Sequence, residues 1–160
     1  MDRAGAARVV PTCVEHAPLM VMSDLPGREE ADAGQNFAGD SLALLDKMIR
    51  AIGLDPAAAY QASLACFHSP GARIGRDELT KCGEIARDHI RLAKPERLIL
   101  FGDGPARALT GEPLVSARGK VHRIEGVRTI ATFHPRWLLQ RPSDKALAWR
   151  DLILLMSESE

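Results

Sequence analysis

One segment, residues 77–101, constrains the fold of this chain more than any other part of the sequence. Its first part, Asp77–Ala93, has apolar side chains three and four residues apart, which is the period of an amphipathic helix. Lys94-Pro95 ends that pattern, and the apolar run Leu98–Phe101 follows before Gly102-Asp103-Gly104. A short apolar run that closes in a glycine-rich turn is typical of a buried strand. The segment therefore predicts a helix that packs on a sheet and leads into one of its strands.

The rest of the chain repeats this alternation of apolar runs and amphipathic stretches. Leu19–Met22 is an apolar run that stops at Pro26-Gly27, which predicts a first strand. Asp40 or Ser41 can then cap a helix that has Gly53 just past its end. The remaining predicted elements are a strand over Ala58–Leu64, a short helix over Pro105–Leu109, a loop holding Arg118-Gly119-Lys120, a strand over Val127–Thr132, and a last helix capped by Ser143 and ending near Met156.

Strands that alternate with helices predict an α/β fold. Right-handed crossovers would give a three-layer α/β/α sandwich around a mostly parallel four-stranded sheet. Ligands of such sheets bind at the carboxyl ends of the strands. The functional residues are therefore expected in the loops that follow the strands: Asp24–Gly27, Cys66–Gly71, Gly102–Gly104 and Phe133–Arg136.

Composition and charge narrow the classes of function. A length of 160 residues suits one domain over residues 1–160, of which 1–17 form an N-terminal extension. No apolar run approaches the ~20 residues of a membrane span, and Met1–Ala7 is not followed by the apolar stretch of a secretion signal. We therefore expect a soluble cytoplasmic monomer without membrane contact. Lys plus Arg number 21, as do Asp plus Glu, so binding to DNA would need a local basic patch.

Two stretches carry a family resemblance. Ser23–Glu30, which reads Ser-Asp-Leu-Pro-Gly-Arg-Glu-Glu, continues into a glycine-flanked loop around Phe37, and Thr132–Leu139 reads Thr-Phe-His-Pro-Arg-Trp-Leu-Leu. With Arg118-Gly119-Lys120 between them, these landmarks resemble the family-four uracil-DNA glycosylases over about residues 19–153. Those enzymes carry Gly-Glu-Ala-Pro-Gly, an acidic pair and Gly-x-Pro-Phe-x-Gly in the first stretch, and His-Pro-Ser-Tyr-Leu-Leu in the last.

The resemblance implies a hydrolase that flips a damaged base out of DNA and cleaves its N-glycosidic bond. Asp24 would orient or activate the attacking water, and His134 would stabilise the departing base. The family has Glu at the position of Asp24, so the carboxylate here is one methylene shorter, and a displacement of ~1 Å can cost ~100-fold in rate. Without the resemblance, Asp24 could equally be a turn residue whose side chain caps its own loop. His134 could likewise be a histidine that only hydrogen-bonds to a backbone carbonyl.

A second set of residues is implied in binding the base. Phe37 would stack on it, although it also suits an anchor of its loop to the core. The family reads the base edge with an Asn that corresponds to Ala62, next to Ser63, so selectivity for uracil over cytosine has no evident source. Glu30 suits a solvated surface carboxylate nearly as well as a pocket residue. The full set is Leu25, Gly27, Glu30, Phe37, Ala62 and Ser63.

The expected contacts with DNA come from two loops. Arg118 and Lys120, with further cations nearby, form the best local basic patch, although scattered surface cations often show such spacing. Arg136 could meet a phosphate while Trp137, Leu138 and Leu139 wedge into the base stack. Alternatively, the apolar residues begin a helix and pack into the core.

The cysteines indicate no iron–sulfur cluster. Cys66 and Cys82 are sixteen residues apart, the separation of two cluster ligands in the resembled family. The other two should form a Cys-x-x-Cys, but this chain has only Cys13 and His16, and such a cluster needs four thiolates. We expect no cofactor and no metal; zinc held by Cys13, His16, Cys66 and Cys82 is the chemically acceptable alternative.

Two other functions stay open at the level of sequence. The departures at the Glu, Asn and Ser positions of the family suit a catalytically degenerate protein that binds nucleic acid or a protein partner without turnover. Binding of a free nucleotide at Gly102-Asp103-Gly104 is a weaker alternative, because this turn lacks the lysine of a phosphate-binding loop.

Overall fold

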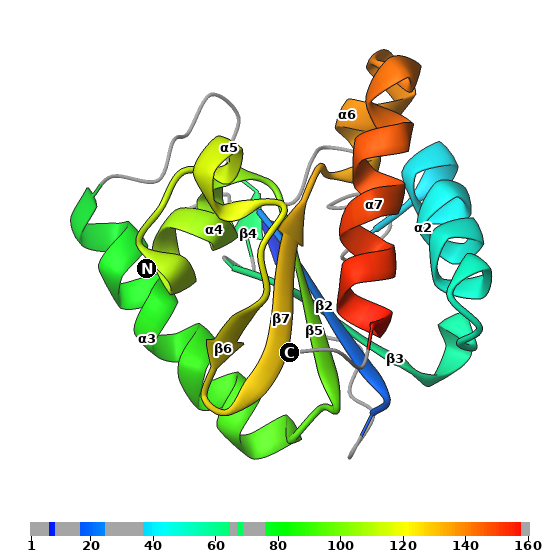
Figure 1. Ribbon diagram of the computed structural model, residues 1–160. Coiled ribbons are helices and arrows are strands. Elements are labelled where there is room, and N and C mark those ends of the chain that lie inside the picture. Colours follow the sequence, from blue (N-terminus) through cyan, green and yellow to red (C-terminus); the bar gives the residue numbers. More distant parts are fainter. Residues whose placement is uncertain (1–6, 9–16, 25–36, 65–66, 69–75, 158–160) are drawn as a thin grey trace.

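The main sheet has five strands in the order β3-β2-β5-β7-β6 (Figure 1). The computed structural model describes residues 7–8, 17–24, 37–64, 67–68 and 76–157. The strands of the main sheet are β2 (Leu19–Ser23), β3 (Ala59–Ser63), β5 (Arg97–Phe101), β6 (His122–Ile124) and β7 (Val127–Thr132). Two short strands, β1 (Ala7–Arg8) and β4 (Phe67–His68), pair with each other and not with this sheet.

The four predicted strands form the parallel part of the sheet. β2 pairs in parallel with both β3 and β5, and β5 pairs in parallel with β7. The fifth strand, β6, was not predicted and runs antiparallel to β7 at the sheet edge. A tight turn joins β6 to β7, with positive φ at both Glu125 and Gly126. Three residues of strand are too few for a periodic signal, which is why sequence patterning missed β6.

Helices cover both faces of the sheet, as expected of an α/β/α sandwich (Figure 1). α3 (Arg76–Ala93), α4 (Asp103–Thr110) and the short α5 (Leu114–Ala117) lie on one face. α2 (Gly39–Ala51), α6 (Pro135–Gln140) and α7 (Lys145–Met156) lie on the other. The single-turn helices η1 (Pro56–Ala58) and η2 (Pro142–Asp144) lead into β3 and α7.

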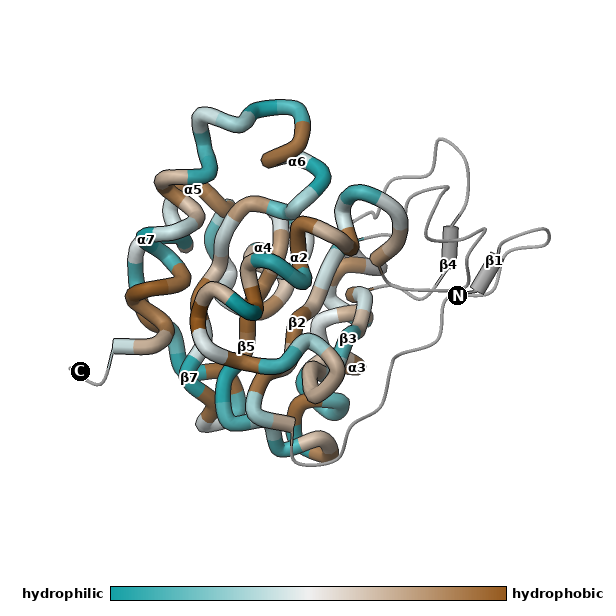
Figure 2. Tube along the Cα trace, turned by 90° about the vertical axis from the view of Figure 1, so that its right-hand side faces the viewer, coloured by the Kyte–Doolittle hydropathy of each residue, from teal (hydrophilic) through white to brown (hydrophobic). Residues whose placement is uncertain are grey.

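Each face of the sheet carries its own hydrophobic core. Met22, Leu100 and Ala62 point to the α3 side, whereas Val21, Ile99 and Ile130 point to the α7 side. This division follows from the alternation of side chains along a strand. The central strands β2 and β5 are accordingly mostly hydrophobic along the chain trace (Figure 2). Burial on both faces fixes the register of the sheet and so fixes where each strand ends.

Two predicted helix caps are wrong. α2 begins at Gly39, and the Ser41 hydroxyl donates to the Ala38 carbonyl at 2.7 Å instead of capping the helix. α7 begins at Lys145, because Ser143 belongs to η2, which ends at Asp144. Boundaries set by caps depend on backbone geometry that a sequence pattern does not fix. Within the described residues, no helix is both long and apolar enough to cross a membrane.

Candidate active site

His134 is fixed at the point where β7 passes into α6. Its backbone is extended, it occupies the N-cap position of α6, and Pro135 takes the first helical position. The ring nitrogen Nδ1 accepts a hydrogen bond from the Arg136 backbone N–H at 3.0 Å. A histidine that caps its own helix in this way has little rotational freedom, so the second ring nitrogen has a defined direction.

The capping bond also fixes the protonation of His134. Because Nδ1 accepts a hydrogen bond, the proton of the neutral ring resides on Nε2. Burial, with a smaller contribution from the charge of Arg136, lowers the pKa of His134 from 6.5 to about 3. Nε2 is buried and has no hydrogen-bond partner among the described residues. At neutral pH His134 is therefore an uncharged imidazole whose buried Nε2–H has no partner among the described residues.

Two aromatic rings hold the imidazole in place. Phe37 stacks on His134 with ring centroids 5.3 Å apart and an interplanar angle of 21°. Phe101, at the end of β5, meets both of these rings edge to face. Phe37 is fully buried, so a base could stack on it only after neighbouring atoms move. Its role as a stacking platform stays a prediction, and in this structure the ring packs in the core.

Asp24 follows β2 at the same edge of the sheet. Its carboxylate lies against Gly104 in the first turn of α4: a Cβ atom built on Gly104 would come within 2.6 Å of Oδ1 and 2.7 Å of Oδ2. The strand order places β5 between the strands that precede Asp24 and His134. Two inter-strand steps separate those strands by about 10 Å.

A cavity of about 460 Å³ opens beside His134. The turn after β5 supplies Gly102 and Asp103 to its wall, and Phe133 and Trp137 flank the histidine. Arg107 lies at this cavity and forms an ion pair with Asp103. Asp24 and Phe37 do not line the cavity. The first turn of α4 contacts Asp24 through Gly104 and the cavity through Asp103.

Comparison with known proteins identifies the family. Residues 10–153 match the family described as the uracil DNA glycosylase superfamily. This chain belongs to that superfamily. It is 27% identical over 147 residues to the type-4 uracil-DNA glycosylase of Pyrobaculum aerophilum, covering 85% of this chain and 75% of the relative. The corresponding enzyme of Archaeoglobus fulgidus is 27% identical over 139 residues, covering 80% and 70%. That of Thermotoga maritima is 25% identical over 137 residues, covering 79% and 69%.

In this superfamily member the two residues expected at the base edge face different surroundings. Ala62 is fully buried in the core on the α3 side, where its methyl group packs with other apolar side chains. Ser63 is half-buried, and the Ser23 hydroxyl donates to the Ser63 hydroxyl at 3.4 Å. Ser63 is therefore the polar group that the β3 end presents near the sheet edge. Leu25, Gly27 and Glu30 lie outside the described residues.

Both cations of the predicted basic patch, Arg118 and Lys120, pair with carboxylates of the protein. The Arg118 guanidinium donates to both carboxylate oxygens of Asp151, at 3.2 and 3.3 Å, and lies 5.5 Å from the centre of the Phe133 ring. Lys120 pairs with Glu112 at 3.1 Å. Contact of these two cations with DNA stays a prediction, and it would compete with the bonds that they already make.

Of the apolar side chains of α6 that were predicted to contact DNA, Leu138 is buried. Trp137 is 41% exposed, whereas Leu138 is 1% exposed and packs in the core. Leu139, also predicted to contact DNA, is 42% exposed. In a helix that begins at Pro135, Leu138 points inward while Trp137 and Leu139 point outward. The periodicity of that helix could have distinguished the buried residue from the exposed ones in the sequence. Arg136 is half-buried beside His134.

Asp151 is a buried carboxylate that sequence reasoning missed. It is 1% exposed and accepts from the Thr132 hydroxyl at 2.8 Å and the Gly119 backbone N–H at 3.2 Å, besides the two bonds from Arg118. Burial raises the pKa of Asp151 against the opposing effect of these donors. Thr132 lies at the end of β7, just before His134. Asp151 thus ties α7 to the strand end that carries the site.

The residues of the chain do not fit the iron–sulfur cluster of the resembled family. The chain has three cysteines, fewer than the four thiolates of such a cluster. Cys82 is buried in α3, while Cys13, His16 and Cys66 lie outside the described residues. Among the residues that the structure describes, no three His, Cys, Asp or Glu side chains gather as a metal site. The absence of a metal and the zinc alternative both stay predictions.

Proposed function

We propose that this protein is a DNA base-excision glycosylase that hydrolyses the N-glycosidic bond of uracil or another deaminated base. The observation that carries the proposal is the neutral His134, whose buried Nε2–H has no partner among the described residues. An unpaired donor in a buried position costs stability, so its retention suits a ligand acceptor. The three relatives, each named as a type-4 uracil-DNA glycosylase, support the same reaction.

The chemistry requires stabilisation of a leaving base. When the bond between C1′ and the base nitrogen breaks, its electron pair leaves with the base, and negative charge develops on the base oxygen. A fixed N–H donor in a water-poor site stabilises that charge without rearranging during the reaction. His134 meets this requirement, because the capping bond to Arg136 holds its ring and the aromatic packing holds its plane.

Asp24 would act on the sugar side of the same bond. A water molecule adds to C1′ as the bond to the base breaks, and one of its protons passes to the Asp24 carboxylate, which afterwards releases it to solvent. The base anion takes up a proton from solvent. The products are the free base and an abasic sugar. A carboxylate also favours the positive charge that develops on the sugar. Asp24 is half-buried and placed at the required sheet edge by β2.

We further propose that the DNA strand crosses the α6 side of the site. Trp137 of α6 lines the cavity beside His134, and the half-buried Arg136 and the exposed Leu139 belong to the same helix. Arg141 lies 5.2 Å from the centre of the Trp137 ring and adds a cation at the same place. Aromatic faces bind bases of any sequence, and cations bind the phosphates.

The test is release of the base from defined oligonucleotides. Single- and double-stranded substrates carrying uracil, hypoxanthine or xanthine are incubated with an excess of enzyme, and abasic sites are cleaved and counted. We expect release from at least one substrate, with a loss of about 100-fold or more in His134→Gln and in Asp24→Asn. The matched controls His122→Gln and Asp40→Asn change the same residue types away from the site and should keep wild-type rates.

The alternative is a degenerate protein that binds without turnover. Failure of the folded wild-type protein to release any of the three bases would reject the catalytic proposal. Binding of the same oligonucleotides without release would then favour the degenerate alternative.

A further inference from the structure

The Asp24 carboxylate occupies space that only a glycine at position 104 leaves open. A Cβ atom on Gly104 would lie 2.6 Å from Asp24 Oδ1 and 2.7 Å from both Cγ and Oδ2. Cβ atoms in proteins essentially never come within 3.0 Å of another heavy atom outside their own chain neighbourhood. The whole carboxyl group, and not one oxygen, is therefore pressed against this residue.

The φ of Gly104 does not itself require glycine, but the proline that follows it is a separate reason for one. Gly104 lies in the first turn of α4 with an ordinary φ, unlike Gly102, whose φ of +97° suits glycine because an L side chain rarely adopts it. In a helix interior, glycine is less favourable than alanine. Residue 105 is a proline whose ring clashes with a Cβ on the residue before it in helical conformation, so the backbone alone already favours glycine here. The contact with the Asp24 carboxylate is a second and independent requirement.

We propose that Gly104 is a positioning residue for the Asp24 carboxylate. The proposal rests on the catalytic role proposed for Asp24. Because Gly104 has no side chain, the first turn of α4 approaches the end of β2 closely enough to define where the carboxylate lies. A methyl group at position 104 would push the carboxylate to an ordinary contact of 3.4–4 Å. That shift is roughly 1 Å, a misplacement that can cost about 100-fold in rate.

The structure also predicts which part gives way. The atoms that a Gly104 side chain would meet belong to the end of the Asp24 side chain and not to the backbone. That end can rotate away at little cost in stability. Gly104→Ala should therefore fold and lose activity, with the loss mainly in kcat because a carboxylate that activates water does not hold the substrate.

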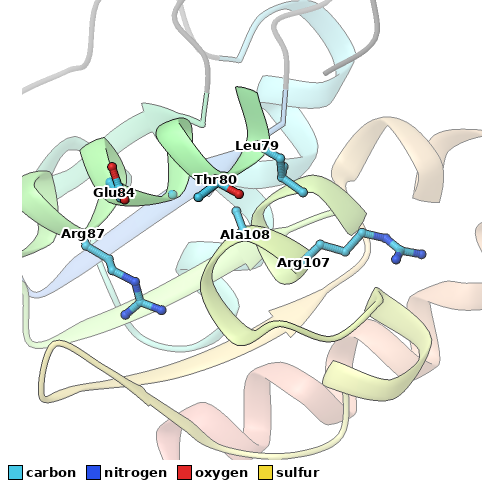
Figure 3. A pocket seen from close by; sticks show the side chains of 7 residues that line it. Leu79, Thr80, Glu84, Arg87, Arg107 and Ala108 are labelled. Atoms are coloured by element: carbon cyan, nitrogen blue, oxygen red, sulfur yellow. The ribbon is translucent and has the colours of Figure 1, made fainter. Parts of the chain in front are cut away.

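Gly83 provides the matched control on the other side of α4. It lies in α3, and a Cβ atom there would come 2.9 Å from the backbone carbonyl oxygen of Ala108 in α4. Ala108 lies at a small cavity of about 210 Å³ between α3 and α4, opposite Thr80 and Glu84 (Figure 3). Gly83→Ala thus strains the same helix through its backbone, away from Asp24. It should lower the melting temperature and leave kcat within about twofold of wild type.

The experiment is a double-mutant cycle between Gly104→Ala and Asp24→Ala, read by thermal melting and by kcat. With Asp24 present, Gly104→Ala should lower kcat by about 10- to 100-fold while the melting temperature changes little. In the Asp24→Ala background the carboxylate is gone, so the change in melting temperature on Gly104→Ala reports only the backbone effect of a Cβ before Pro105, and it should differ by about 2–4 °C from the change seen with Asp24 present. The same change should then cost no further activity.

Two results would overturn the proposal. An equal shift in melting temperature in both backgrounds would show that residues 24 and 104 do not interact, whatever the activity of the protein. A kcat of Gly104→Ala within twofold of wild type would show that the contact does not position a working carboxylate. An inactive wild-type protein would instead reject the proposed function and with it the catalytic role of Gly104, and the melting cycle would still decide the contact.

Discussion

At the scale of single residues, the decisive feature is a histidine kept neutral by its own helix. Position 134 is an N-cap, and the hydrogen bond from the Arg136 backbone N–H occupies Nδ1. A cationic imidazole would have to give up that bond, because both ring nitrogens would then be donors. Burial acts in the same direction on the pKa. The chain thus sets protonation state, tautomer and ring direction with local interactions.

A neutral His134 predicts a specific loss of stability in acid. The pKa of His134 falls from 6.5, the ordinary value of an exposed histidine, to about 3 in the folded protein. Between these pH values the unfolded chain binds a proton at this histidine and the folded protein does not, so stability falls as pH falls. From pH 7 to pH 5 the loss from this one group is about 2 kcal/mol.

Urea unfolding at several pH values measures this effect. The His134→Gln variant should lose about 2 kcal/mol less than wild type between pH 7 and pH 5, while His122→Gln should keep the full loss. An identical pH dependence in wild type and His134→Gln would contradict a neutral buried imidazole.

The same protonation state predicts the pH dependence of activity. His134 donates through Nε2 as a neutral ring from pH 7 down to pH 5, because its pKa of about 3 lies below this range. We therefore expect kcat/KM to show no acid limb with an apparent pKa near 6.5. Rates of base release in overlapping buffers test this, and a loss of activity centred near pH 6.5 that vanishes in His134→Gln would contradict it.

At the scale of elements, the ends of β2, β5 and β7 act together. Asp24 follows β2 and His134 follows β7. The turn after β5 leads into α4, whose first turn contacts the Asp24 carboxylate and lines the cavity beside His134. Asp151 of α7 accepts a hydrogen bond from Thr132 at the end of β7 and forms an ion pair with Arg118, which follows α5. The site therefore depends on hydrogen bonds between elements that are far apart in the sequence.

Loss of the Asp151 carboxylate should loosen these elements. Asp151→Ala leaves the largely buried Arg118 without its anion and the Thr132 hydroxyl without its acceptor, which should lower the free energy of unfolding by about 3 kcal/mol. The matched control is Glu112→Gln, which removes the exposed partner of Lys120 and should cost less than about 0.5 kcal/mol. Denaturant unfolding at neutral pH compares them, and equal losses would contradict the structural role of Asp151.

At the scale of the whole molecule, two tryptophans of similar exposure lie in different places. Trp137 is 41% exposed on α6 beside the cavity at His134. Trp149 is 43% exposed on α7 and lines a groove against α2. If DNA crosses the α6 side, only Trp137 meets a base. The pair therefore separates a DNA contact from a general effect of removing an exposed ring.

We expect Trp137→Ala to weaken binding of single-stranded DNA by about tenfold, which lies within the range for one base stacked on an aromatic side chain. Trp149→Ala should leave the dissociation constant unchanged. Fluorescence anisotropy of a labelled oligonucleotide measures both. Equal weakening by the two variants would contradict the proposed path of the strand.

The charge of the molecule predicts a shallow dependence of this binding on salt. Basic and acidic residues balance at 21 each, and Arg118, Lys120 and Arg128 are bound by protein groups. With about two phosphates neutralised, the slope of log affinity against log salt should lie between about −1 and −2. A slope steeper than about −4 in the same anisotropy titration would indicate an extensive basic surface and contradict this prediction.

Much of the fold could be predicted from local pattern. The run Leu98–Phe101 is continuous because β5 is buried on both faces, and the helix before it shows the expected period. Both patterns arise from burial of a regular element, which the sequence records directly. Strand β6 was not predicted because it pairs on one side alone and has only three residues, which is too short a segment to show a periodic pattern of apolar residues.

The candidate site divides in the same way. The sequence by itself determined that Asp24 and His134 follow strands, and parallel strands bring such residues to one edge for a geometric reason that needs no coordinates. Only the tertiary structure decided that Ala62 packs in the core, that Leu138 points inward, that Arg118 is held by Asp151, and that Gly104 lies against the Asp24 carboxylate. Each of these depends on atoms brought together from distant parts of the chain, and the three-dimensional packing that joins them is not written in the local spacing of residues.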